Sequence, residues 1–186
     1  MFKLESRWVC RQSAILAPNA KNLIDIGSDS DNYRIKIQPY IAAMYQELEQ
    51  DGIRIKTLDI DPALAPDFVQ DICQPLNFHD QFNIVLALNV LEHIEKDKIH
   101  MAINNLFRLT KPDGIVIVTV PYNLPRHDRP IDNMLRPTTR ELKLLMGNDC
   151  LLCEQWQDEH YRKPYISHSG LAPKPIVTGG VFKKRA

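Results

Sequence analysis

The chain has 186 residues, of which 44% are hydrophobic, and its 23 Lys and Arg residues balance 23 Asp and Glu residues for a formal net charge of +0. This length suits one domain over residues 1–186 with a single core, and the absence of net charge argues against nucleic-acid binding as the main activity. The N-terminus is too charged for a signal peptide and no apolar run is long enough to cross a bilayer, so we expect a cytoplasmic protein that does not bind membranes.

Predicted strands and helices alternate along the chain after a short amphipathic helix. We expect helices over residues 6–16, 33–50, 96–109 and 138–146. We expect strands over residues 23–27, 53–60, 68–69, 82–88, 115–120, 151–156 and 176–182. The second helix should break at Pro39, because proline removes a backbone donor. The alternation requires crossover connections and therefore predicts an α/β fold with a mostly parallel sheet.

The fourth predicted strand indicates where a ligand would bind. Its apolar run, residues 82–88, is followed by the polar side chains of Asn89, Glu92 and His93. Open α/β sheets bind their ligands at the carboxyl ends of their strands. The sequence therefore predicts a ligand site at this end of the sheet.

The turn after the first strand argues against one class of cofactor. Dinucleotide-binding turns follow the pattern G-x-G-x-x-G, because their backbone must approach a pyrophosphate closely. The turn here, residues 27–32, keeps only the first of these glycines, Gly27. Asp29 and Asp31 would repel a pyrophosphate that faced them. We therefore expect neither NAD nor FAD.

Several segments of the chain resemble, in the right order, the motifs of class I S-adenosylmethionine (SAM)-dependent methyltransferases, in particular the type 11-like group. The motifs are carried by Ile24–Gly27, Leu58–Pro62, Asp67–Ile72, Phe82–Ile94 and Leu106–Gly114. The resemblance covers roughly residues 22–146. It implies a Rossmann-like, seven-stranded, mostly parallel sheet with helices on both faces and an antiparallel last strand.

The resemblance also implies SAM as the cofactor, held by Asp25, Gly27, Asp59, Ile60, Asp71, Ile72 and Asn89. In the family, the residue matched by Asp59 binds the ribose hydroxyls, the one matched by Asp71 binds the adenine amino group, and the one matched by Asn89 lies near the methyl donor. Asp29 and Asp31 replace the second and third glycines of the first motif. SAM has no phosphate and carries an ammonium and a sulfonium, so these carboxylates are compatible with it. A second hypothesis is a methyltransferase-like domain that has lost SAM and acts as a binding or scaffold protein.

The polar segment over residues 122–137 is the predicted acceptor side of the site. The part of it over residues 127–137 is similar to a segment of methyltransferases in sugar, glycan or secondary-metabolite pathways, which implies methyl transfer to a small-molecule acceptor. There His127 would accept a proton from a substrate hydroxyl, Asp128 or Asp132 would orient its imidazole, and Arg136 would hold a carboxylate or phosphate. The alternative is a segment tied down by an ion pair between Asp132 and Arg136. His93 is either a second general base or a structural histidine.

The pair Cys150 and Cys153 has the C-x-x-C spacing but lacks two further ligands at matching spacing, so we expect no metal site. Two small, partly apolar side chains of the core are the structural alternative. The sequence predicts no particular oligomeric state.

Overall fold

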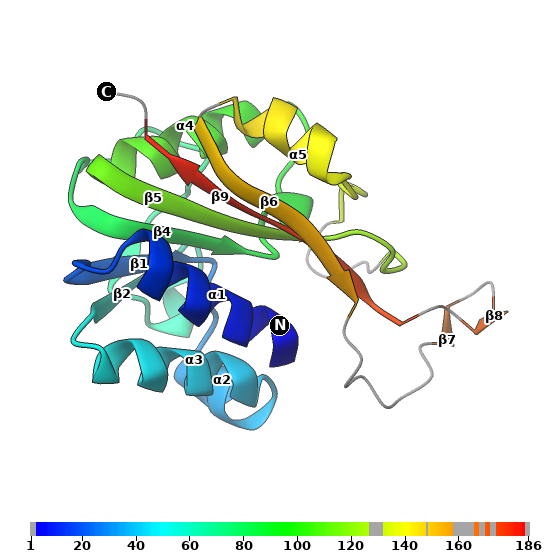
Figure 1. Ribbon diagram of the computed structural model, residues 1–186, viewed down its shortest axis with the longest axis horizontal. Helices are drawn as coiled ribbons and strands as arrows, with labels where there is room; N and C mark the ends of the chain where they lie inside the picture. Colours follow the sequence, from blue (N-terminus) through cyan, green and yellow to red (C-terminus); the bar gives the residue numbers. More distant parts are fainter. Residues whose placement is uncertain are drawn as a thin grey trace.

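A seven-stranded sheet with helices on both sides forms the centre of the computed structural model (Figure 1). The structure describes residues 3–126, 132–147, 149–157, 166–167, 170–171 and 174–184. The strands of the sheet are β1 (Asn22–Ile26), β2 (Arg54–Asp59), β3 (Phe68–Val69), β4 (Phe82–Leu88), β5 (Thr110–Pro121), β6 (Asp149–Gln157) and β9 (Ile176–Lys183). The helices are α1 (Lys3–Leu16), α2 (Asp31–Lys36), α3 (Pro39–Gln50), α4 (Ile99–Leu109) and α5 (Thr139–Met146). Two short strands, β7 (Ile166–Ser167) and β8 (Gly170–Leu171), pair with each other outside this sheet.

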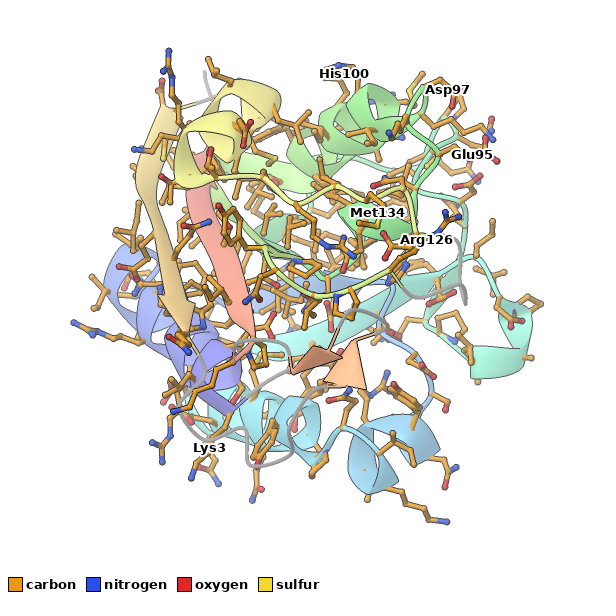
Figure 2. The ribbon with its side chains drawn as sticks, turned by 90° about the vertical axis from the view of Figure 1, so that its right-hand side faces the viewer. Lys3, Glu95, Asp97, His100, Arg126 and Met134 are labelled. Atoms are coloured by element: carbon orange, nitrogen blue, oxygen red, sulfur yellow. The ribbon has the colours of Figure 1, made fainter. Side chains whose placement is uncertain are left out.

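The strand order confirms the expected fold class. The sheet runs β3-β2-β1-β4-β5-β9-β6, and the first five of these strands pair in parallel. β9 lies antiparallel between β5 and β6. The parallel strands all end on the right-hand side of Figure 1, which is also where α1 begins. That side is the carboxyl edge of the sheet, and Figure 2 views the molecule from there.

Two apolar layers hold the helices against the sheet. Alternate residues of each central strand point to opposite faces, so Leu23 belongs to one cluster of buried residues and Ile24 to the other. The first cluster takes Trp8 and Val9 from α1 together with residues of α3. The second takes its helical residues from α4 and α5. Because both faces of β4 and β5 are covered, the buried parts of these strands are nearly continuous apolar runs.

The local signals place most element boundaries correctly. The predicted break at Pro39 separates α2 from α3, and Pro39 occupies the first turn of α3. Thr138 begins α5 with a capping box, in which its side chain and that of Glu141 bond each other's backbone N–H groups.

Among the described residues no helix is both long and apolar enough to cross a membrane.

Three element starts differ from the sequence prediction by three residues or more: α4 begins at Ile99 instead of residue 96, and the starts of β5 and α1 also differ. β5 begins at Thr110 instead of residue 115, because the pairing with β4 shifts between Phe82 and Ile84 and admits the turn residues into the strand. Asp113 takes a positive φ of 64° in this irregular part. α1 begins at Lys3 instead of residue 6, which adds a turn at the carboxyl edge of the sheet.

A stacked pair of tryptophans, one from α1 and one from β6, holds α1 against the sheet. The ring centroids of Trp8 and Trp156 are 4.7 Å apart with an interplanar angle of 29°, and the Trp8 indole donates to Glu154. Gly179 of β9 lies directly beneath them. A Cβ atom at Gly179 would lie 2.4 Å from the ring of Trp156 and 2.9 Å from that of Trp8. Only glycine therefore lets both rings approach the sheet this closely.

We predict that Gly179→Ala lowers the free energy of unfolding by about 1–3 kcal/mol, because the rings must move away from the added methyl group. Urea denaturation gives the free energy, and near-UV circular dichroism reports the tryptophan pair. The control is Gly147→Ala, where φ is +62° but no atom of the described residues, apart from the chain neighbours, lies within 4 Å of the new Cβ. That variant should lose about 1 kcal/mol to backbone strain and keep its near-UV spectrum. An unchanged near-UV spectrum in Gly179→Ala would contradict the packing argument.

Candidate cofactor and active site

The turn after β1 keeps a glycine-type backbone although it has lost two glycines. Gly27 has φ +69°, and its N–H donates to the carbonyl of Leu58 at 2.8 Å. A Cβ at Gly27 would lie 3.0 Å from a methyl group of Val90. Asp29, at the place of the second family glycine, has φ +59°. Aspartate is one of the few residues besides glycine that tolerate this left-handed region, so the turn preserves its path.

Arg34 of α2 ties this turn together from inside. Its guanidinium is buried, donates to the carbonyl of Ser28 at 2.8 Å and to that of Asp29, and pairs with the carboxylate of Asp31. The carboxylate of Asp29 accepts from the N–H of Ser30 at 2.6 Å. Both aspartates that replace family glycines are thus bonded within their own turn. The hydroxyl of Ser28 is buried there, and no group in the described part of the chain bonds it.

Asp25, the acidic residue of the first motif, is almost completely buried. It is 4% exposed and accepts a 2.6 Å hydrogen bond from the hydroxyl of Tyr45 on α3. Burial raises the pKa of Asp25 to about 7, although the bond from Tyr45 and the charge of Arg34 oppose that rise. Asp59 lies close enough to raise the pKa of Asp25 further. The charge at the carboxyl end of β2 therefore affects the protonation of Asp25 at the end of β1.

The predicted adenosine-binding residues follow β2 and β3. Asp59 accepts from the N–H of Asp61 at 3.0 Å through Oδ1, and no described residue donates to its Oδ2. Ile60, next in the chain, is apolar yet 65% exposed. Asp71 accepts from the N–H of Cys73 at 2.8 Å, and Ile72 is buried. The structure brings the two carboxylates to neighbouring strand ends, since β2 and β3 pair through Asp59 and Val69.

Asn89 joins the ends of β4 and β5 to the N-terminal helix. It has φ +56°, and its N–H donates to the carbonyl of Thr119 at 2.9 Å. Its side-chain Nδ2 donates to Glu5 Oε1 at 2.7 Å, and the hydroxyl of Thr119 donates to the same oxygen at 2.5 Å. Glu5 is fully buried at 0% exposure. The sequence analysis did not identify Glu5, because the predicted helix began after it. The one signal for a buried polar partner was Thr119, a polar residue near the end of an otherwise apolar strand.

Glu92 and His93 lie in a 3-10 turn, η2 (Leu91–His93), just after β4. Glu92 is 1% exposed, and its Oε2 has no hydrogen-bond partner among the residues that the structure describes. Burial raises the pKa of Glu92 to about 8; Glu5 and Asp132 raise it further, and Arg136 opposes them. His93 Nε2 is 3.9 Å from Glu92 Oε1, and the imidazole is 23% exposed. A catalytic role for His93 stays a prediction.

Arg136 and Asp132 form an ion pair in the segment after β5. Asp132 bonds the guanidinium at 2.6 and 3.3 Å, and its side chain is fully buried. Arg136 also donates to the carbonyls of Leu124, Pro125 and Leu135, so each of its five N–H groups has a protein partner. These contacts are those of the structural alternative, and acceptor binding by either residue stays a prediction. His127 and Asp128 lie outside the described residues.

The side chains around this ion pair include polar and apolar groups. Figure 2 shows Arg126 and Met134 on the segment that follows β5, while Glu95, Asp97 and His100 lie further out around the start of α4. Met134 is 46% exposed. An acceptor that approached the strand ends from this direction would therefore meet both kinds of group.

Cys150 and Cys153 pack against the core cluster that includes α5. Cys153 donates to the carbonyl of Thr139 at 3.4 Å, and burial raises its pKa to about 11, which favours the neutral thiol. Within the described parts of the chain no group of three His, Cys, Asp or Glu side chains could hold a metal ion. These contacts suit the structural alternative for the cysteine pair.

The buried polar atoms that lack partners test whether a polar ligand fits here. Three of them follow parallel strands at the carboxyl edge: Ser28 Oγ after β1, Gln70 Oε1 after β3 and Glu92 Oε2 after β4. A buried polar group without a partner is unfavourable and points to a missing bonding group. Together with the open Oδ2 of Asp59 and the exposed Ile60, these atoms offer polar and apolar contacts along one edge. The residues present therefore fit a ligand with the mixed chemistry of SAM.

The raised pKa of Glu92 makes stability depend on pH. A carboxyl group whose pKa rises from 4.5 to about 8 on folding stabilises the protein below pH 4.5, and this contribution is lost as pH rises through 8. We predict that the wild type loses roughly 1–4 kcal/mol more than Glu92→Gln between pH 5 and pH 8. Urea denaturation at both pH values measures the difference. Glu49→Gln, the same change at an exposed site, should follow the wild type, and parallel profiles for wild type and Glu92→Gln would disprove the prediction.

Solved structures with this fold include several methyltransferases. A TehB-like SAM-dependent methyltransferase from Corynebacterium glutamicum has 16% identity and a TM-score of 0.59, with 100% of this chain and 89% of that chain covered. The 1,6-didemethyltoxoflavin-N1-methyltransferase from Burkholderia thailandensis, with bound 1,6-didemethyltoxoflavin and S-adenosylhomocysteine (SAH), has 13% identity, a TM-score of 0.63 and 97% and 79% coverage. The [4+2]-cyclase SpnF has 13% identity, a TM-score of 0.67 and 99% and 82% coverage. At these identities the likeness establishes the fold.

The family follows from the sequence itself. No curated protein matches the chain. A sequence model of the family described as "Methyltransferase domain" matches residues 2–164, which is most of the chain. This match confirms the family that the motifs predicted, and the fold shared with SAM-dependent methyltransferases agrees with the predicted enzyme class and cofactor. The chain belongs to the methyltransferase domain family and has the fold of the class I SAM-dependent enzymes.

Proposed function

We propose that this protein transfers a methyl group from SAM to a small-molecule acceptor. The observation that carries the proposal is the meeting of three acidic side chains, Asp25, Asp59 and Asp71, at the carboxyl ends of three adjacent parallel strands. Each strand end supplies a different environment, from the buried Asp25 to the partly exposed Asp59. This is the edge where open α/β sheets bind ligands.

The roles follow from what each group can bond. Asp59, with Oδ2 open, accepts the two ribose hydroxyls, and the exposed Ile60 covers one side of the adenine ring. Asp71 accepts from the adenine amino group beside Ile72. The turn at Gly27 approaches the methionine part, and Asn89 lies toward the methyl donor. Bound SAM supplies an electrophilic methyl group on its sulfonium, so the protein's tasks are to orient the acceptor and to exclude water.

The altered glycine turn is the main argument for the scaffold alternative. A loop that had lost its cofactor would have no need to keep a left-handed backbone at Asp29 or a buried arginine beneath it. The bonds from Arg34 to the turn carbonyls stabilise this path in place of glycine's freedom. Both features support a turn that has changed its residues while preserving a binding conformation.

A small molecule is the acceptor class that the charge and the fold support best. The net charge of +0 gives no general attraction to nucleic acid. One structural relative holds a small heterocycle, 1,6-didemethyltoxoflavin, together with SAH. The cyclase SpnF shares the fold, so the fold alone does not fix the reaction. His127 and His93 are the candidate bases for an acceptor that must lose a proton.

We predict that the purified protein binds SAH with micromolar affinity and that Asp59→Ala weakens this binding at least about tenfold, because two hydroxyls lose a charged acceptor. Isothermal titration calorimetry measures both values. Asp61→Ala is the matched control, since Asp61 lies in the same turn and its carboxylate accepts, among the described residues, only the local N–H of Ala63. Its affinity should stay within about threefold of the wild type.

Two results would count against the proposal. Absence of SAM and SAH binding to the wild type at millimolar ligand would favour the scaffold alternative. Equal losses in the two aspartate variants would place the effect in the turn's conformation and remove the ribose role from Asp59. With binding established, release of SAH from SAM in the presence of candidate acceptors tests the transfer itself.

A further inference from the structure

Glu5 is a buried acid at the carboxyl edge for which the family motifs assign no role. It lies near the start of α1, on the side of the molecule toward which the parallel strands run (Figure 1). Its Oε1 accepts hydrogen bonds from Asn89 after β4 and from Thr119 near the end of β5. A side chain separated from Asn89 by 84 positions in the sequence thus reaches the centre of the proposed methyl-transfer site.

The chemistry of the two groups fixes how the amide of Asn89 lies. A carboxylate accepts hydrogen bonds and has none to give, whereas an amide has a donor end and an acceptor end. The NH2 end of Asn89 must therefore face Glu5, as the 2.7 Å bond shows. Its carbonyl oxygen, Oδ1, is consequently turned away from Glu5. The backbone N–H of Asn89 is held by the carbonyl of Thr119, so main chain and side chain are both fixed.

We propose that Glu5 is a positioning residue of the methyl-transfer site. It holds the side chain of Asn89 so that the amide oxygen of Asn89, Oδ1, is directed at the ligand. This inference rests on the proposed function, in which Asn89 lies toward the methyl donor. An amide oxygen held in this way suits a hydrogen-bond donor on the ligand, such as the ammonium group of SAM and SAH. The N-terminal helix is then a part of the cofactor site as well as a cover for the sheet.

Thr119 allows the positioning role to be separated from simple docking of the helix. It donates to the same Glu5 oxygen and is itself fully buried, but its loss leaves the bond between Glu5 and Asn89 intact. Thr119→Val removes this bond with little change in shape. It should weaken the docking of α1 while the amide of Asn89 keeps its direction.

The test is isothermal titration of SAH into the full-length wild type, Glu5→Gln and Thr119→Val. We expect Glu5→Gln to weaken SAH binding about tenfold, because the new amide no longer dictates which end of Asn89 it faces. Thr119→Val should bind within about threefold of the wild type despite a lower melting temperature. The double variant Glu5→Gln/Asn89→Asp reverses donor and acceptor within the pair and again directs an oxygen at the ligand. It should recover binding to within about threefold of the wild type.

Each outcome separates this inference from the proposed function. If the wild type binds no SAH, the proposed function and this inference both fail. If the wild type binds SAH and Glu5→Gln binds it equally well, this inference alone is wrong. Equal losses in Glu5→Gln and Thr119→Val would show that Glu5 only docks the helix. Should Glu5→Gln not fold, a folded double variant that binds about tenfold more weakly than wild type would overturn the inference.

Discussion

The need to provide donors for buried carboxylates organises the carboxyl edge of this sheet. A carboxylate removed from water is unfavourable unless hydrogen bonds or opposite charge replace its hydration. Asp25, Glu5 and Asp132 each meet this need with a donor from another part of the chain: Tyr45 on α3, Asn89 and Thr119 at strand ends, and Arg136. The edge is therefore held together by specific polar bonds. The apolar layers beneath it fix where the helices lie, and these bonds fix how the site residues point.

The turn after β1 keeps a left-handed backbone at Asp29, although the glycine that usually allows this conformation is absent. Glycine reaches the left-handed region without a steric penalty, whereas aspartate does so at some cost in strain. Here the strain at Asp29 is offset by bonds from the buried guanidinium of Arg34 to the carbonyls of Ser28 and Asp29. Arg34 also lies 5.3 Å from the centre of the Tyr45 ring. The same arginine thus connects the turn to the residue that bonds Asp25.

The architecture was predictable because each element carries its own local signal. The apolar runs predicted the central strands, Pro39 marked the break between two helices, and the predicted helix over residues 138–146 begins with a capping box of Thr138 and Glu141. The start of β5 was wrong, since the admission of its turn residues depends on pairing with β4, which is not a local property. Family motifs could indicate Asp25, Asp59 and Asn89 as site residues, and the structure places them at one edge.

The partners of these residues could not be predicted in the same way. Tyr45 lies within the predicted helix over residues 33–50, and only the folded chain shows its hydroxyl at Asp25. Glu5 lies outside the motifs altogether and bonds Asn89, which is 84 positions away in the sequence. Such contacts have no periodicity and no fixed spacing, because tertiary packing alone brings the two segments together. The groups that bind a ligand are thus easier to predict than the groups that orient them.

The two carboxyl groups with the largest upward shifts connect stability to ligand binding. Burial holds the pKa of Asp25 at about 7 and that of Glu92 at about 8, so both are partly protonated near neutral pH. A cation that arrives nearby favours the charged form and lowers such a pKa. SAM carries two positive groups and one carboxylate, so an acid of this edge that lay beside a positive group would lose its proton more readily when the ligand binds. The burial that makes such an acid destabilising at high pH would then be offset by the bound cation, which couples the cost of burying it to ligand recognition.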